Sequence, residues 1–293
     1  MDYTDSDAHT ITFARAFYPQ STYTHAYVAS KAAGLPRHAH ALSSARPDTI
    51  WRALEEGITM TTDARVSIED GVVFGRAGAF ELLCDIYTPP GELTSAPAVI
   101  VVHGGSWRGS DRKQLRGYCL LLGRMGYVCI APEYRLSGQA QWPAPLHDLK
   151  AAIRWTRANA ERLHINPDQI SVMGGSAGAH LALMLGGTQD VARFEGECGT
   201  PGLSTAVASV LSFCGITDVQ PGGDFLVDSL DDLLGKDASL DRYREASPID
   251  HITSAYPPTF ILHSSKDATV PYRQATAMYD ALLAAGVEVE MHL

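Results

Sequence analysis

The chain has 293 residues, of which 45% are hydrophobic, so it can bury a large core and is not expected to be disordered. Its 33 acidic residues outnumber 23 basic ones and give a formal net charge of −10. Because phosphate groups and anionic lipids attract basic surfaces, this charge argues against a nucleic-acid or membrane partner. No segment reaches the roughly 20 apolar residues that span a bilayer, and the acidic start lacks the features of a secretory signal. These observations predict a cytoplasmic protein, with a mature chain already stripped of its leader as the alternative.

Residues 1–65 differ in composition from the rest of the chain. They are rich in Thr, Ser, Ala and His and contain no strongly apolar strand, so we expect an N-terminal extension or cap. The tract at 37–40, Arg-His-Ala-His, fits no common metal-ligand spacing. The cysteines match no Cys/His pattern either, so no metal site is predicted. We expect free, buried thiols at Cys84, Cys119, Cys129, Cys198 and Cys214.

From Val66 onward, predicted strands and helices alternate. Nearly continuous apolar runs at 98–102 and 127–131 are typical of strands buried on both faces of a parallel sheet. The alternation indicates a mostly parallel sheet wrapped by helices, in one domain over 66–293 with an insertion around 220–247. Further strands are predicted at 66–68, 72–74, 80–87, 169–173, 206–214, 259–263 and from 287, and helices at 115–125, 146–163, 177–185 and 273–285.

A Gly-x-Ser-x-Gly motif at 174–178, Gly-Gly-Ser-Ala-Gly, follows a predicted strand and opens a predicted helix. This setting is the one that a nucleophile elbow requires, because the sharp turn exposes the serine hydroxyl and small neighbours leave room for the turn. The helix N-terminus favours negative charge developing nearby. Ser176 is therefore the predicted nucleophile. The alternative is a Gly-rich turn that binds nothing, or a phosphate.

A second motif at 103–107, His-Gly-Gly-Ser-Trp, follows the strand that ends at Val102. Acyl transfer needs preorganised N–H donors for the oxyanion, and small residues let backbone amides approach it. We predict that the amides of Gly105, Ser106 and Ala177 form this oxyanion hole. His103 is expected to brace the loop rather than to carry a proton.

A third motif at 263–271, His-Ser-Ser-Lys-Asp-Ala-Thr-Val-Pro, ends a predicted strand and comes after Ser176. The chain order Ser, then acid, then His is typical of hydrolase triads on α/β sheets. Asp267 is the predicted triad acid, and Asp218, after the preceding strand, is the reserve candidate.

Together these motifs resemble the α/β-hydrolase superfamily, and within it the hormone-sensitive-lipase-like and feruloyl/acetyl esterase group. The resemblance runs from about Val66 to the end and includes matching segments at 132–136, 143–148, 176–182 and 247–249. It implies the α/β-hydrolase fold and hydrolysis of small carboxylic esters without a cofactor. It also implies Ser176 as nucleophile and Asp267 as triad acid.

The family carries the triad histidine on the loop after the last strand. Here that strand begins at Val287 and the sequence ends at Leu293, so we expect the histidine to lie beyond Leu293 and the C-terminal part of the fold to be missing. His292 is the alternative base. Strand alternation places it within the strand, on the face of Glu288 and Glu290, rather than on the loop.

Two classes of function remain open. The first is an esterase that forms an acyl-enzyme at Ser176, with Trp107, Tyr134 and Trp142 as candidate pocket lining. An arylformamidase, whose group carries a related loop motif, is the alternative within this class. The second is a catalytically silent hydrolase-fold protein that binds a ligand or a partner. We also keep open a homodimer formed through the last strands of the sheet.

Overall fold

The computed structural model describes residues 65–222 and 225–293. Its strands are β1 Ser67–Ala77, β2 Phe80–Thr88, β3 Ala96–Val102, β4 Val128–Pro132, β5 Ile165–Gly175, β6 Val210–Phe213, β7 Thr259–Leu262 and β8 Val289–His292. Its helices are α4 Arg116–Arg124, α5 Ala144–Ala158, α6 Ala160–Leu163, α7 Ala177–Gly187, α8 Val227–Leu234, α9 Leu240–Glu245 and α10 Arg273–Ala284. Two 3-10 turns are η1 Ala192–Phe194 and η2 Pro248–His251.

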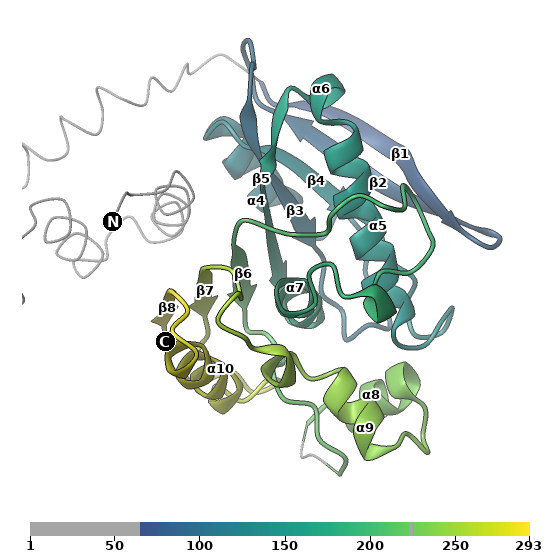
Figure 1. The fold of residues 1–293 in the computed structure, drawn as a ribbon, viewed down its shortest axis with the longest axis vertical. Coiled ribbons are helices and arrows are strands. Elements are labelled where there is room, and N and C mark those ends of the chain that lie inside the picture. The colour runs from purple at the N-terminus through teal and green to yellow at the C-terminus, as the bar shows by residue number, and fades with distance from the viewer. Residues whose placement is uncertain (1–64, 223–224) are drawn as a thin grey trace, which may run out of the picture. The chain divides into compact units, whose positions relative to one another are not determined.

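The strands form one eight-stranded sheet in the order β1-β2-β4-β3-β5-β6-β7-β8 (Figure 1). β1 pairs antiparallel with β2, and β2 pairs antiparallel with β4. Every pair from β4 to β8 is parallel. The predicted mostly parallel α/β sheet is confirmed.

The strand order reverses between β3 and β5. The connection from β3 through α4 to β4 runs one way across the sheet, and the connection from β4 through α5 to β5 runs the other way. Because both crossovers are right-handed, α4 lies on one face and α5 on the other, with α7 beside α5 (Figure 1). The carboxyl ends of β3 and β5 flank this reversal, which is the usual place for a ligand in such sheets.

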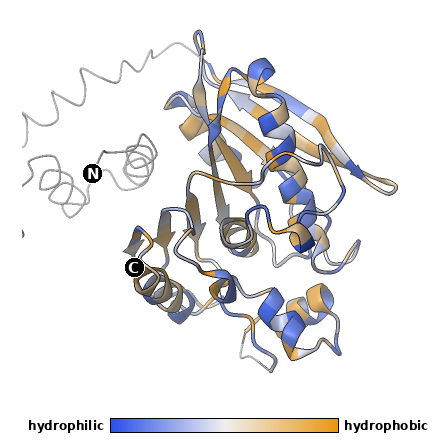
Figure 2. Cartoon of the chain, in the orientation of Figure 1, coloured by the Kyte–Doolittle hydropathy of each residue, from blue (hydrophilic) through white to orange (hydrophobic). Residues whose placement is uncertain are grey.

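The core lies between the sheet and its helices. β4 is buried along its whole length, and Pro97 is the one half-buried residue of β3. Figure 2 shows the central strands in the hydrophobic colours and blue patches on α5, α8 and α9. On α5, Leu149, Ile153 and Thr156 are all buried. In the described part of the chain, no helix has the length and hydrophobicity needed to cross a bilayer.

Several predicted element boundaries were wrong, and three of them show why. The two short strands at 66–68 and 72–74 are one strand, β1, because irregular pairing around Gly71 absorbs the break in the pattern. The helix predicted at 146–163 ends at Ala158, and Asn159 separates it from α6. The strand predicted at 206–214 begins only at Val210, since the Ala206 carbonyl bonds the Arg157 guanidinium instead of a neighbouring strand.

The interruption predicted around 220–247 contains α8 and α9, between β6 and β7. Arg108 holds α8 against the loop after β3, because its guanidinium pairs with Asp232 at 2.5 Å and bonds the Asp228 carbonyl at 2.9 Å. The predicted N-terminal extension at 1–65, with its His tract, lies outside the described residues except for Arg65.

Candidate active site

Ser176 stands at the turn between β5 and α7, as the residue that caps the helix N-terminus. Its backbone has φ 53° and ψ −120°, a conformation that costs energy for any residue with a side chain. The turn is held because the Ser176 amide donates to the Phe213 carbonyl at 2.8 Å, at the end of β6. This is the strained strand-to-helix turn that the sequence predicted.

The two outer glycines of the motif are required by packing. A Cβ on Gly178 would clash with the carbonyl oxygens of Val102 and His103. A Cβ on Gly174 would clash with the backbone of Gly178. A Cβ on the middle residue, Gly175, would meet no atom within 4 Å. Among the glycines of the motif, Gly178 is therefore required for the close approach of the elbow to the end of β3, and Gly174 is required for the turn itself.

The loop after β3 lies against the elbow. A Cβ on Gly104 would be 2.7 Å from the Gly175 carbonyl oxygen and 3.4 Å from the Ser176 Cβ, so the loop can approach only because residue 104 is glycine. The Gly104 amide is fixed by the Gln114 side-chain oxygen at 2.7 Å. Two of the three sequence motifs thus meet at the carboxyl ends of β3 and β5.

The predicted oxyanion donors are backbone amides in unusual conformations. Gly105, Ser106 and Trp107 have consecutive φ values of 108°, 53° and 58°. None of the hydrogen bonds found within residues 65–222 and 225–293 uses the amide of Gly105, Ser106 or Ala177. Amides left unbonded beside a helix N-terminus are suited to hold an anionic oxygen.

Asp267 lies in the loop after β7, with its two carboxylate oxygens in different surroundings. Oδ1 accepts the amides of Thr269 at 2.8 Å and Val270 at 2.9 Å, whereas Oδ2 lies 3.8 Å from Nε2 of His263. Burial opposes ionisation of this carboxyl, but the two amides outweigh burial, so its pKa lies below the ordinary value. Asp267 is an ionised carboxylate whose Oδ1 is fixed by two amides, and the Cys214 thiol adds a side-chain hydrogen bond to the same carboxylate.

The reserve acid, Asp218, is held differently. Its amide and carbonyl both bond the Gln274 side chain, and its Oδ1 accepts from the Gln220 side chain. These contacts give Asp218 a place in the packing of the loop after β6.

Five of the described histidines use a ring nitrogen for a hydrogen bond to a group other than Ser176. Their partners are the carbonyls of Gly104 for His103, Ala246 for His180, Glu245 for His251 and Val270 for His263, and the Glu290 carboxylate for His292. His292 lies within β8 opposite Leu262, as strand alternation predicted. Among the hydrogen bonds of the described residues, none joins a histidine to Ser176.

The model of the BD-FAE family matches residues 84–282, a stretch that contains all three motifs. The chain belongs to the BD-FAE family of α/β-hydrolase esterases.

Relatives of this BD-FAE chain carry esterase names. It is 32% identical over 252 residues to the probable carboxylic ester hydrolase LipM of Mycobacterium tuberculosis (strain ATCC 25618 / H37Rv), over 80% of this chain and 58% of LipM. It is 33% identical over 199 residues to the esterase LipC of the same strain, over 64% of this chain and 49% of LipC. The chain thus spans about half the length of these curated relatives.

A solved structure has the same fold. A truncated form of a carbohydrate esterase from gut microbiota superposes with a TM-score of 0.71 at 26% identity, over 78% of this chain and 87% of that chain. The predicted α/β-hydrolase fold and esterase family are therefore confirmed for this BD-FAE member.

The aromatic residues predicted for the pocket of the BD-FAE chain are almost wholly buried. Trp107, Tyr134 and Trp142 expose 0%, 3% and 2% of their surface. The rings of Trp107 and Trp142 pack edge-on against His180, at centroid distances of 5.0 and 5.8 Å. Through these contacts the two tryptophans pack the 103–107 loop and the start of α5 against α7. A role of the three aromatic residues in binding substrate stays a prediction.

Two ion-pair clusters behind the site were missed by sequence reasoning. Arg135 makes a two-pronged pair with the fully buried Asp148, with N···O distances of 2.8 and 2.7 Å. Arg112 bridges the buried Asp85 and Glu133. The segments at 132–136 and 143–148 could have indicated these ion pairs, because they place charged residues beside apolar runs, and buried charges need partners.

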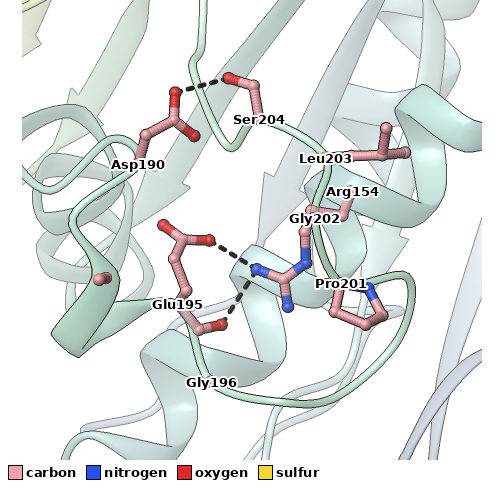
Figure 3. Close-up of a pocket in the computed structure, with 9 residues that line it drawn as sticks. Arg154, Asp190, Glu195, Gly196, Pro201, Gly202, Leu203 and Ser204 are labelled. Atoms are coloured by element: carbon pink, nitrogen blue, oxygen red, sulfur yellow. Dashed lines mark hydrogen bonds and ion pairs between the residues drawn. The ribbon is translucent and has the colours of Figure 1, made fainter.

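A cavity of about 430 Å³ lies away from the elbow of this BD-FAE chain, between α5 and the segment that follows α7 (Figure 3). α7 begins at Ala177, next to Ser176, and the cavity lies beside the segment that follows the other end of this helix, at Gly187. Its charged groups are already paired, Arg154 with Glu195 at 2.6 Å and Ser204 with Asp190 at 2.7 Å. We assign it no part in ester chemistry.

Proposed function

We propose that this chain is a serine hydrolase of small carboxylic esters, with Ser176 as the nucleophile. The observation that carries the proposal is the position of Ser176, on a strained turn at a helix N-terminus, beside amides of Gly105, Ser106 and Ala177 that bond no described group. Strain of this kind persists where the surrounding packing enforces it and is typical of functional positions.

In the proposed reaction, the Ser176 oxygen attacks the ester carbonyl carbon and its proton passes to a base. The carbonyl oxygen becomes an oxyanion that the amides of Gly105, Ser106 and Ala177 hold. Collapse of this intermediate breaks the bond to the alcohol, which leaves with the proton from the base. Water then attacks the acyl-enzyme, gives a proton to the same base and frees the carboxylic acid as the Ser176 oxygen leaves and is reprotonated.

Asp267 is proposed as the acid that orients the base. Its Oδ1 is fixed by two amides, and we propose that Oδ2 accepts an imidazole N–H from the base. We propose that the base is a histidine that follows β8, beyond Leu293. Support comes from the described histidines, five of which already direct a ring nitrogen at another group.

For the substrate we propose an ester with a short acyl group. A relative of known structure is named as a carbohydrate esterase, so an acetylated sugar is the first substrate class to try. Trp107, Tyr134 and Trp142 are proposed to define the pocket by fixing its walls, since their own side chains are buried.

The test is hydrolysis of p-nitrophenyl acetate by the purified chain, with and without free imidazole. Imidazole is expected to enter the position of the absent base and raise the rate at least tenfold over the same addition to Ser176→Ala. The Ser176→Ala control is essential because imidazole itself cleaves activated esters. If wild type and Ser176→Ala have equal rates at every imidazole concentration, the proposal fails, and a ligand-binding hydrolase fold becomes the better account.

A further inference from the structure

Three side chains with metal-binding atoms converge near the elbow, although Cys214 is far from His263 and Asp267 in the sequence. Cys214 follows β6, and His263 and Asp267 follow β7, the next strand of the sheet. The Cys214 sulfur, a ring nitrogen of His263 and a carboxylate oxygen of Asp267 all lie within 4.8 Å of one another. Parallel neighbouring strands end at the same edge, which is why these residues meet.

Each of the three groups is held in place by the backbone around it. The Cys214 backbone has φ 51°, and its amide donates to the Leu262 carbonyl at 2.8 Å. His263 is 1% exposed, and its Nδ1 is buried with no hydrogen-bond partner among the described residues. Asp267 keeps Oδ1 on two amides, so Oδ2 is the oxygen that faces the cluster.

The donor set selects one class of ion. Thiolate, imidazole and carboxylate together suit Zn²⁺ and Co²⁺, whereas Ca²⁺ and Mg²⁺ prefer oxygen donors alone. Three protein ligands leave the fourth position of a tetrahedral ion for water. Ligand atoms around such an ion lie about 3.5 Å apart. Nε2 of His263 and Oδ2 of Asp267 are already 3.8 Å apart, and no separation within the cluster exceeds 4.8 Å, so binding needs only a small contraction.

We propose that Cys214, His263 and Asp267 form a binding site for a zinc-class divalent ion. On binding, the Cys214 thiol releases its proton to solvent and the sulfur binds as thiolate. Nε2 of His263, which now donates to the Val270 carbonyl at 2.8 Å, gives up that bond, and the neutral ring carries its proton on Nδ1. Asp267 binds through Oδ2 as it stands.

A bound ion is expected to switch off ester hydrolysis. This consequence rests on the proposed function, because it takes Asp267 to be the acid that orients the base. The ion occupies Oδ2, the oxygen that the base would need. Metal binding itself does not depend on any reaction at Ser176, so the two can be tested apart.

The test is a titration of the metal-free 293-residue chain with Co²⁺, followed by absorbance. We expect one equivalent to bind, with a near-ultraviolet thiolate-to-cobalt band and the visible bands of a four-coordinate ion, and Zn²⁺ to displace it. Cys214→Ser should lose the near-ultraviolet band, whereas Cys198→Ser, the other half-buried cysteine, should keep it. Histidines alone, such as those at 38 and 40, cannot produce this band.

Asp267→Asn provides a second variant if Cys214→Ser does not fold, and it should weaken Co²⁺ binding at least tenfold. Absence of the band in wild type at saturating Co²⁺, or its persistence in Cys214→Ser, would overturn the proposal. Ser176→Ala should bind Co²⁺ as wild type does. Cobalt binding without Ser176-dependent hydrolysis would therefore sink only the esterase proposal, and hydrolysis without cobalt binding would sink only the metal site.

Discussion

The ring of Tyr134 lies over the ring of His103, with centroids 4.3 Å apart and planes 11° apart. The Tyr134 hydroxyl also donates to the His103 carbonyl at 3.0 Å, so one side chain holds both the ring and the backbone of the residue that opens the 103–107 loop. Burial lowers the pKa of His103, which keeps the stacked ring neutral near pH 7.

Tyr134→Phe removes the hydroxyl and keeps the stacked ring. The variant leaves the buried His103 carbonyl without its donor and should lower the free energy of unfolding by about 1–2 kcal/mol. Urea unfolding at pH 7 measures this. Tyr272→Phe, an exposed tyrosine, is the control and should change stability by less than about 0.5 kcal/mol. Equal losses in the two variants would show that the hydroxyl does not support the loop.

Alanine substitutions within the 174–178 motif should have opposite outcomes. The methyl group of Gly178→Ala would clash with two backbone carbonyls. These carbonyls cannot move without separating β3 from α7, so we expect the free energy of unfolding to fall by about 3 kcal/mol or more. Gly175→Ala finds open space and should stay within about 1 kcal/mol of wild type. Thermal and urea unfolding of the two variants checks this. A Gly178→Ala protein as stable as Gly175→Ala would contradict the packing described at the elbow.

A substitution at Gly105 should act on reactivity. Ala at this position would need φ near 108° and would clash with the Gly109 carbonyl, so the loop has to move and its amides with it. Since oxyanion donors contribute about 10²–10³ in rate, Gly105→Ala should slow labelling of Ser176 by a fluorophosphonate by that factor. Gly109→Ala, with open space around its Cβ position, is the matched control. If both variants react at the wild-type rate, the 105–106 amides are not the oxyanion donors.

His180 predicts a loss of stability in acid. Burial lowers its pKa from the ordinary 6.5 to about 4, so the unfolded chain binds this proton more readily between those values. The contribution of neutral His180 to the free energy of unfolding is therefore fully present above pH 6.5. It is lost as the pH drops toward 4, by at most about 3 kcal/mol for this one group. His180→Gln should lose less stability than wild type between pH 7 and pH 4.5 in urea unfolding. Identical pH dependence in the two proteins would show that His180 is not a buried neutral group.

Local patterns in the sequence predicted the parts of this fold that depend on local geometry. The elbow follows from Ser176 between a strand and a helix, and the apolar runs of β3 and β4 follow from burial on both faces. The contacts of Tyr134 with His103 and of Arg135 with Asp148 could not be predicted. They depend on the β4–β3–β5 order of the strands, which brings together segments that are distant in the sequence. The hydrophobic pattern of one segment does not indicate which other segment it will contact.

The same limit applies to the cluster of Cys214, His263 and Asp267. Cysteine spacing along the chain gave no metal pattern, because the ligands come from the ends of two neighbouring strands rather than from one motif. The strand boundaries at β1 and β6 were wrong for a related reason. Irregular pairing at Gly71 and the Arg157 contact with Ala206 are tertiary features that periodicity does not contain.

The central claim is that Ser176 is the nucleophile, and the most direct measurement is the site of covalent labelling by a fluorophosphonate. The 293-residue chain, incubated with the probe in the presence of imidazole, should gain one adduct, and peptide mass spectrometry should locate it on Ser176. Ser176→Ala should gain none under the same conditions. An adduct on another residue, or equal labelling of wild type and Ser176→Ala, would contradict the assignment of Ser176.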